Sequence, residues 1–328
     1  MIEFHPIART AVDFQQGISA ESIEAICCRT FGGQTRAVAA RELGTGLFNS
    51  TYLLQLHDGQ QAVLRVSPQP QAAIFTHERF LLRREQGLET ALTAVCPLAP
   101  QTLFADFSQE LLDRDWVIQT FVTGELWDVV QGELSAAETA VLWQQLAEIA
   151  KQIHTATGPH FGFPDNNPGF ERWSTAVAHI TQIMRDDLTA LGLDRPDTQT
   201  YADCLVAGQA LLDAVSIPRL VHGDLWPKNV LIDRAQSPPK IVGLLDAERG
   251  IWGDPLAEWI FYYYEVPDAF WDGYGRPPTD PATQFRQLTY HGLYTIQLLL
   301  EATRFGWEPE PFWQTLAEVN QKMESMVS

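Results

Sequence analysis

The chain has 328 residues, of which 45% are hydrophobic and 19% are charged. This composition is typical of a globular protein with one large or two ordinary domains, and it excludes a disordered chain. Acidic residues outnumber basic residues by 41 to 22, which gives a net charge of −19. Because such a polyanion repels phosphates, we expect neither nucleic acid nor an anionic membrane as a partner.

The sequence also predicts a cytoplasmic location. No apolar run approaches the roughly 18 residues of a membrane-spanning helix. Residues 1–10 have neither the basic nor the apolar segment of a secretion signal. The four cysteines, at positions 27, 28, 96 and 204, form no Cys-x-x-Cys pair and no metal-ligand spacing. We therefore expect free thiols in a reducing compartment.

Residues 1–120 predict a small and mostly antiparallel sheet with a leading helix. Helical spacing extends from Ile18 to Thr30, and Ser19 is a suitable N-cap. Strands are expected over residues 37–43, 50–56, 61–66, 103–107 and 116–121. The Asp58-Gly59 pair is typical of a hairpin turn between the second and third of them. One more helix is expected over residues 72–84.

Helices dominate the pattern after Gly124. The strongest extends from Ser135 to His154, where Ser135 and Glu138 have the spacing of a capping box. Further helices are expected over residues 173–191, 199–215, 284–305 and 311–326, and short strands over 219–222, 230–233 and 240–245. The predicted fold is α+β and bilobal, with a sheet lobe (1–120), a hinge near residues 119–124 and a larger helical lobe (121–328).

One segment of the helical lobe has the residue types that phosphoryl transfer requires. An apolar strand leads into His222-Gly223-Asp224, Asn229 follows five residues later, and a second apolar strand ends at Asp246. A carboxylate can orient an acceptor hydroxyl and take its proton, and carboxylate and amide oxygens suit Mg²⁺ better than Zn²⁺. Each residue alone is more often a turn former or a cap, but the joint spacing favours chemistry.

This segment, HGDLWPKN, and the later IVGLLDAE resemble the aminoglycoside phosphotransferase and choline/fructosamine kinase group. Those proteins are small-molecule kinases with the protein-kinase-like fold, and the resemblance extends over residues 31–259. It implies ATP and Mg²⁺ as cofactors, Asp224 as the catalytic base, and Asn229 and Asp246 as magnesium ligands. Glu248 would be a further acidic group near the substrate.

A glycine-containing loop between two predicted strands supports a nucleotide site. Gly44 and Gly46 allow the backbone to approach phosphates, and Asn49 and Ser50 complete the loop. The loop is neither a P-loop nor a dinucleotide fingerprint, because no Gly-Lys-Ser/Thr follows and the next element is a strand. An ordinary tight turn is the alternative.

The kinase pattern also requires a cation on the third strand and a glutamate on the following helix. Arg65 has the place of the usual lysine, and no lysine occurs before Lys151. Arginine is permanently charged and can bridge two phosphate oxygens. We expect Glu78 to be its partner; an ordinary surface ion pair is the alternative. The resemblance further implies that adenine binds backbone groups from Gln119 to Phe121.

Two departures separate the chain from protein kinases. Trp226 follows Asp224 where protein kinases have a cation, and Leu245-Asp246-Ala247-Glu248 replaces Asp-Phe-Gly with no later Ala-Pro-Glu. Both favour a small-molecule kinase.

The charge distribution favours a cationic acceptor, such as an amino sugar or an amine-bearing alcohol. Residues 121–328 contain 28 acidic and 13 basic residues, against 13 and 9 in residues 1–120. The candidate acids are Asp128, Glu133, Asp254, Glu258, Glu265 and Asp268. Trp252, Trp259 and residues 261–264 are candidates for stacking on a sugar or an ammonium group. A solvated acidic surface and ordinary aromatic packing are the alternatives.

The favoured function is therefore ATP- and Mg²⁺-dependent phosphorylation of a hydroxyl group on a small cationic molecule. A ketoamine or fructosamine-type kinase acting on glycated lysine is one alternative, because residues 222–226 are close to that group. A nucleotide-binding pseudokinase that serves as an interaction module is another, because Arg65 replaces lysine.

Overall fold

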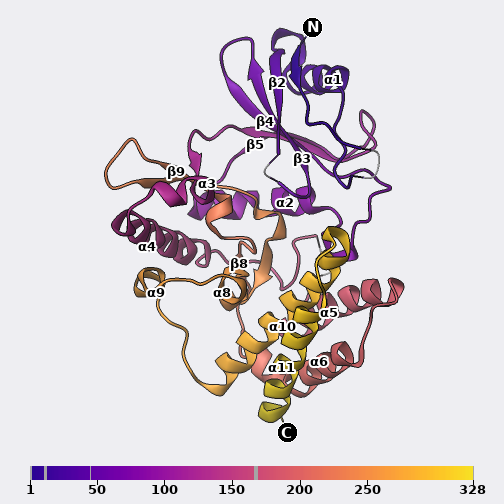
Figure 1. Cartoon of the computed structure of the whole chain (residues 1–328), viewed down its shortest axis with the longest axis vertical. Coiled ribbons are helices and arrows are strands. Elements are labelled where there is room, and N and C mark those ends of the chain that lie inside the picture. Colours follow the sequence, from indigo (N-terminus) through magenta and orange to yellow (C-terminus); the bar gives the residue numbers. More distant parts are fainter. Residues whose placement is uncertain (1, 11–12, 45, 166–168, 328) are drawn as a thin grey trace.

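The computed structural model of the chain describes residues 2–10, 13–44, 46–165 and 169–327. A sheet forms one lobe and helices form most of the other, so that the two chain ends lie at opposite ends of the molecule (Figure 1). This is the bilobal α+β architecture that the sequence predicts. Among the described residues, no helix combines the length and the apolar character needed to cross a membrane.

The sheet of the first lobe has six strands. They are β1 (Glu3–His5), β2 (Ala37–Leu43), β3 (Ser50–Leu56), β4 (Gln61–Val66), β5 (Thr102–Asp106) and β6 (Trp116–Thr120). Their order is β1-β2-β3-β4-β6-β5, with β1 parallel to β2 and the other pairs antiparallel. Every second residue of β3 is buried, as period-two alternation requires. Tyr52 and Leu54 on this face share a core with Ile23 of α1 (Ala20–Phe31).

The helix expected over residues 72–84 is wrong. Residues 76–78 form a single 3₁₀ turn, and α2 spans Leu81–Val95. Phe80 has φ = 64°, a left-handed conformation that interrupts any helix passing through it. Phe75 is apolar because it is buried in the core of the other lobe, and its spacing therefore does not indicate a helix. Glu85 therefore lies near the start of α2, and Glu78 lies outside it.

The second lobe contains the remaining elements. Its longer helices are α4 (Ala136–Ile153), α5 (Trp173–Ala190), α6 (Pro196–Ala207), α9 (Asp268–Tyr274), α10 (Pro281–Phe305) and α11 (Glu310–Val327), and its short ones are α3 (Trp127–Val130), α7 (Gln209–Leu212) and α8 (Ile260–Tyr263). The capping box before α4 is present, with Ser135 Oγ accepting from Glu138 N at 3.3 Å. Helices α10 and α11 pack together, and α4 packs against α9 (Figure 1).

Two small sheets hold the loops that carry the predicted chemistry. One has the order β10-β9-β7, with β10 (Lys240–Leu244), β9 (Val230–Asp233) and β7 (Glu125–Leu126). The other pairs β11 (Ile251–Gly253) with β8 (Arg219–Val221). Asp224 and Asn229 lie between β8 and β9, and Asp246 follows β10. The strands thus bring the two predicted loops to one place.

The connection between the lobes is packed against β9 and β10. A Cβ atom on Gly124 would lie 2.9 Å from Val242 Cγ2 and 3.0 Å from Leu231 Cβ. Both neighbours belong to the small sheet, so the backbone of the connection approaches the strands too closely for a side chain.

Gly124→Ala should therefore destabilise the protein. We expect the free energy of unfolding to fall by about 1–3 kcal/mol, because the added methyl group overpacks the contact. Gly132→Ala is the matched control, since a Cβ atom there meets nothing within 4 Å. Chemical denaturation of both variants checks this, and equal stabilities would contradict the packing argument.

Candidate active site

The loop after β8 is organised around a hydrogen bond between Asn229 and Asp224. Asn229 Nδ2 donates to Asp224 Oδ2 at 2.7 Å and to the Asp224 carbonyl at 2.9 Å. The next loop is joined to it, because Leu245 N donates to the Asn229 carbonyl at 2.8 Å. Asp246 then adopts the left-handed conformation at φ = 67°. Non-glycine residues in this region are strained and often lie at functional sites.

Glu258 hydrogen-bonds the backbone of the turn that precedes Asp224. Its carboxylate accepts from the backbone N–H groups of His222 at 2.8 Å and of Gly223 at 3.1 Å. His154 Nε2 lies 3.2 Å from the same carboxylate. Burial alone would raise the pKa of Glu258, but the hydrogen bonds with His154 and with the His222 backbone hold it below its ordinary value. Glu258 thus fixes the backbone of the turn as a charged group.

Three residues predicted to contact the substrate are instead structural. Glu258 is fully buried under the turn, and Asp254 is buried where it accepts from Tyr290 Oη at 2.7 Å and pairs with Arg286 at 2.9 Å. Trp252 is buried in β11, in the core shared with α4. Their hydrogen-bonding capacity or their apolar surface is already used within the fold, so we withdraw these substrate assignments.

Three carboxylates surround the Arg65 side chain. Its Nη1 donates to Glu85 Oε2 at 2.5 Å, and its Nη2 donates to Asp246 Oδ1 at 2.5 Å and to Glu248 Oε2 at 2.7 Å. Burial alone would lower the pKa of Arg65, but the nearby carboxylates raise it instead. Arg65 joins β4 to α2 and to the loop after β10.

The carboxylates of this cluster exceed the positive charge that faces them. Burial and the neighbouring Asp246 raise the pKa of Glu248, although Arg65 opposes the shift. Burial is also the main cause that raises the pKa of Glu85, and it raises the pKa of Asp224 to about 7. Excess negative charge in a poorly solvated place is unfavourable, so the cluster has capacity for a further cation.

The oxygen atoms at this place fit a magnesium ion held together with a nucleotide. Among the residues that the structure describes, no three His, Cys, Asp or Glu side chains group as a complete metal site. Mg²⁺ commonly binds one or two carboxylates and completes its shell with phosphates and water. Asp246, about one third exposed, and the amide oxygen of Asn229 are donors of the appropriate hard type.

The expected pair between Arg65 and Glu78 is wrong. Glu78 is buried beside the end of α10 and bonds both terminal nitrogens of Arg304, Nη1 at 2.7 Å. The Arg304 guanidinium also lies over the rings of Phe75 and Phe14, at 4.6 and 4.4 Å from their centres. The partner of Arg65 is Glu85, which sequence spacing missed because the helix begins nine residues later than predicted.

The glycine-containing loop is held in place from both sides. Asn49 Nδ2 donates to Glu248 Oε2 at 2.5 Å, which connects the loop to the second lobe. Gln15 Nε2 donates to the carbonyls of Gly46 at 3.1 Å and Asn49 at 2.8 Å, and Ser50 Oγ donates to the Gln16 carbonyl at 3.2 Å. Gly44 adjoins the loop at the end of β2, and Thr45 lies outside the described residues. Glu248 thus bonds both Asn49 of this loop and Arg65.

The predicted adenine-binding segment divides into two parts. Gln119 lies within β6, enclosed between β4 and β5, and its side chain hydrogen-bonds Glu85. Its backbone is therefore engaged in the sheet. Phe121 follows the end of β6 and is half-buried. Of the predicted segment, Phe121 is the residue whose backbone lies outside the strand.

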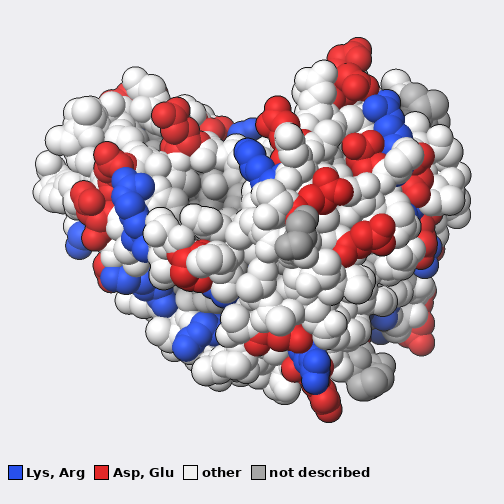
Figure 2. Space-filling view, turned by 90° about the horizontal axis from the view of Figure 1, so that it is seen from below, with Lys and Arg blue, Asp and Glu red and all other residues white. Residues whose placement is uncertain are grey.

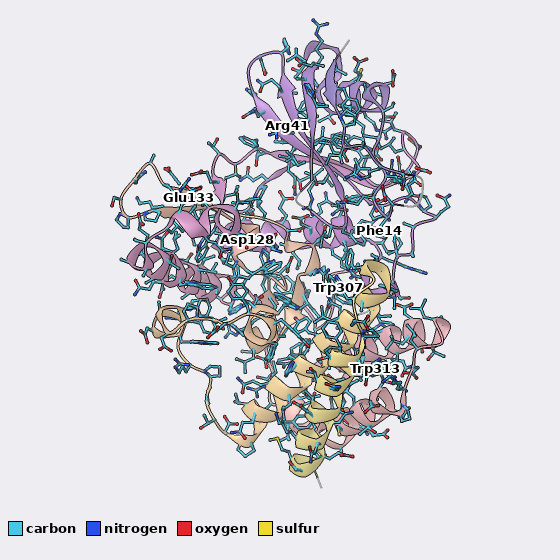
Figure 3. All side chains as sticks on the ribbon, viewed as in Figure 1. Phe14, Arg41, Asp128, Glu133, Trp307 and Trp313 are labelled. Carbon is cyan, nitrogen blue, oxygen red and sulfur yellow. The ribbon has the colours of Figure 1, made fainter. Side chains whose placement is uncertain are left out.

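The other acidic candidates lie outside the Arg65 cluster, and Glu265 is exposed. Glu133 pairs with Arg234 at 2.7 Å, and Asp268 pairs with Arg276. Asp128 and Glu133 lie near α3, across the view from Trp313 of α11 (Figure 3). Seen from below, basic and acidic groups alternate over the surface (Figure 2). Of the aromatic candidates, Trp259 packs edge-on against Trp226, with ring centres 5.0 Å apart.

Comparison with known proteins agrees with this geometry. The model of the phosphotransferase enzyme family matches residues 39–284, and the sequence matches no curated protein. Similar solved structures include a thermostable mutant of aminoglycoside phosphotransferase APH(4)-Ia, with 19% identity and a TM-score of 0.61 over 93% of this chain and 98% of that one. Another is a protein assigned as a fructosamine-3-kinase of Thermobifida fusca YX-ER1, with 20% identity and a TM-score of 0.64 over 94% and 100%.

The role of Glu258 generates a stability prediction. Glu258→Ala leaves two buried N–H groups without an acceptor, so we expect the free energy of unfolding to fall by about 3–5 kcal/mol. Glu265→Ala, at an exposed position of the same segment, should change it by less than about 0.5 kcal/mol. Urea denaturation measures both, and a small loss in Glu258→Ala would show that the turn does not depend on this carboxylate.

Proposed function

Since this chain belongs to the phosphotransferase enzyme family, we propose that it is an ATP- and Mg²⁺-dependent kinase that phosphorylates a hydroxyl group of a small molecule. One observation carries the proposal. Asp224, Asn229 and Asp246 lie in two loops joined by hydrogen bonds, and Asp246 contacts the buried cation Arg65. A solved relative, the N202A variant of the APH(4)-Ia mutant, was obtained with AMP-PNP and hygromycin B (20% identity, TM-score 0.58, 93% of this chain and 98% of that one).

Asp224 is the base in the proposed reaction. The acceptor oxygen forms a bond to the γ-phosphorus of ATP while the bond from that phosphorus to the β–γ bridging oxygen breaks. ADP leaves, and the hydroxyl proton passes to the Asp224 carboxylate. The hydrogen bond from Asn229 holds one oxygen of this carboxylate and leaves the other for the acceptor. With a pKa of about 7, the Asp224 carboxylate can accept a proton near neutral pH and release it again, as a general base must.

Arg65 and the glycine-containing loop position the nucleotide in this proposal. Arg65 has a fork of donors suited to phosphate oxygens, and the glycines of the loop would let phosphates approach its backbone. Asn229 and Asp246 would hold Mg²⁺, which when bound offsets negative charge on the phosphates. The bond between Asn49 and Glu248 places the loop directly over the Arg65 cluster.

Asp224→Asn should abolish most transfer and leave nucleotide binding in place. We expect kcat to fall by about 10²–10⁴, because the amide cannot accept the hydroxyl proton. The assay follows ADP release with an acceptor found by mass-spectrometric screening of hydroxylated small molecules, and calorimetry follows ATP binding. Asp272→Asn, at an exposed position of α9, is the control. Unchanged turnover in Asp224→Asn would remove this residue from the mechanism.

The screen also separates the two alternatives. Transfer onto a glycated-lysine peptide would identify a ketoamine kinase. ATP binding with no transfer to any acceptor would favour a nucleotide-binding interaction module.

The two glutamates near the lobe junction should differ in their effect on ATP. Glu85→Gln removes a carboxylate that orients Arg65, so we expect KM for ATP to rise about tenfold. Glu78→Gln should change it by less than about twofold, because Glu78 bonds Arg304. Initial rates at varied ATP concentration measure both, and the reverse order would restore Glu78 as the partner of the nucleotide site.

A further inference from the structure

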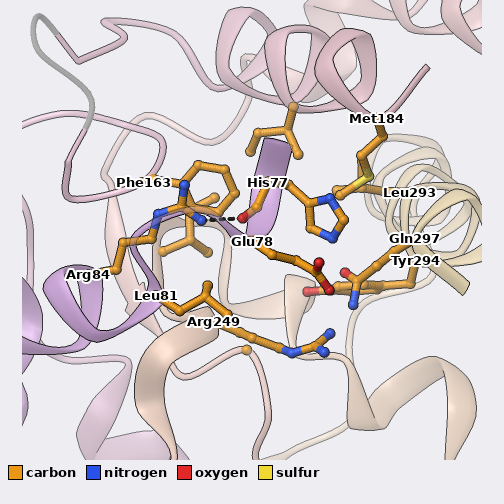
Figure 4. Close-up of a pocket in the computed structure, with 13 residues that line it drawn as sticks. His77, Glu78, Leu81, Arg84, Phe163, Met184, Arg249, Leu293, Tyr294 and Gln297 are labelled. Atoms are coloured by element: carbon orange, nitrogen blue, oxygen red, sulfur yellow. Dashed lines mark hydrogen bonds between the residues drawn. The ribbon is translucent and has the colours of Figure 1, made fainter. Parts of the chain in front are cut away.

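A cavity of about 60 Å³ lies on the side of the catalytic turn that faces α5 and α10. Its wall includes Gly223, the residue directly before Asp224, and Arg249, which follows the Asp246 loop. A Cβ atom on Gly223 would lie 2.4 Å from the Arg249 carbonyl oxygen, so these two segments are in contact. Figure 4 shows side chains from both lobes converging on this space. The cavity has room for roughly five water molecules, which is enough for one small chemical group.

The imidazole of His77 faces this cavity with no hydrogen bond of its own. The residue is 6% exposed, and neither ring nitrogen has a partner among the described residues. Burial, and then the charge of Arg249, lower its pKa to about 3, so the ring is neutral. It therefore offers one donor and one acceptor. Buried polar groups are normally hydrogen-bonded, so the ring is available to bond a group that enters the cavity.

The charges in the cavity wall are already neutralised. Arg249 Nη2 donates to Glu301 at 2.9 Å. Arg84 Nε donates to Asp165 at 2.8 Å. The single acid of the wall, Glu78, is bonded to Arg304.

Apolar side chains make up much of the remaining wall. They are Leu81, Phe163, Ile180, Met184, Ile251 and Leu293. An ammonium group placed here would meet two guanidinium groups and would find no carboxylate without a cation. The lining therefore favours an uncharged occupant with an apolar part and one hydrogen-bonding group.

We propose that this cavity receives one end of the acceptor of phosphoryl transfer, that His77 hydrogen-bonds this end, and that the acceptor is an uncharged hydroxylated molecule with an apolar part. The proposal rests on the kinase function proposed above. The phosphorylated oxygen lies toward Asp224, and the apolar part lies toward α5 and α10. The bond changes are those already given, with the hydroxyl proton passing to Asp224 and ADP leaving. This acceptor differs from the cation that the acidic composition predicts, because the acids of the second lobe do not line the cavity.

Paired acceptors test the chemical class. Wild-type protein with MgATP is assayed against a series of aryl glycosides, each beside its 2-amino-2-deoxy counterpart, and against hygromycin B and kanamycin. Mass spectrometry detects the phosphorylated products, and ADP release gives kcat/KM. We expect the neutral member of a pair to be preferred at least tenfold. Preference for the amino members or for the two antibiotics overturns the proposal, as does the absence of transfer to every neutral member.

Substitution of His77 tests the residue itself. His77→Leu should lower kcat/KM for the preferred acceptor about tenfold or more, mainly through KM, and His77→Gln should recover part of the loss. The unfolding temperature of His77→Leu should equal or exceed that of the wild type, because an unpartnered buried polar ring is removed. His179→Leu, at an exposed position of α5, is the matched control.

The outcomes separate this inference from the kinase proposal. If His77→Leu lowers both the unfolding temperature and the activity, and His77→Gln does not recover them, the ring has a structural role and the inference is overturned. Transfer to cationic acceptors that is unaffected by His77→Leu also overturns it, while the kinase function stands. Failure of the wild type to bind MgATP, measured by calorimetry, overturns both proposals.

Discussion

Ion pairs with three carboxylates hold the Arg65 guanidinium in place. One guanidinium holds carboxylates from α2 and from the loop after β10, so it links the sheet to the second lobe. Burial, together with the neighbouring Asp246, raises the pKa values of Glu85 and Glu248, and the positive charge of Arg65 offsets only part of the shift. In the proposed function, Mg²⁺ would offset part of the remaining negative charge.

The same principle distinguishes the groups around Asp224. Glu258 is fully buried, yet hydrogen bonds with His154 and with the His222 backbone hold its pKa below the ordinary value. Burial raises the pKa of Asp224, which directly follows the turn that Glu258 holds, and the hydrogen bond from the neutral Asn229 amide offsets part of this shift. One carboxylate is thereby fixed as a structural anion, and the other can gain and release a proton. Two carboxylates in adjoining segments thus have different chemistry because their hydrogen-bond partners differ.

Much of the fold follows from local pattern. Strands β2, β3 and β4 begin and end at the predicted residues, because period-two alternation and the Asp58-Gly59 turn are both local signals. The capping box at Ser135 has the same advantage. The start of α2 had no such signal: Phe75 has helical spacing but is buried in the core of the other lobe, and no sequence pattern marks the left-handed conformation of Phe80. That error displaced the predicted partner of Arg65 from Glu85 to Glu78. The catalytic motif identified the loops, whereas the burial of Asp254 and the unpartnered ring of His77 depend on contacts between distant segments.

The ion pair between Glu78 and Arg304 connects the two lobes. Glu78 comes from the first lobe and Arg304 from the end of α10, and the aromatic rings of Phe14 and Phe75 cover the guanidinium. Separating the lobes at this contact would break the ion pair and leave two buried charges unpaired, which is unfavourable. The ion pair therefore opposes separation of the two lobes beside the end of α10.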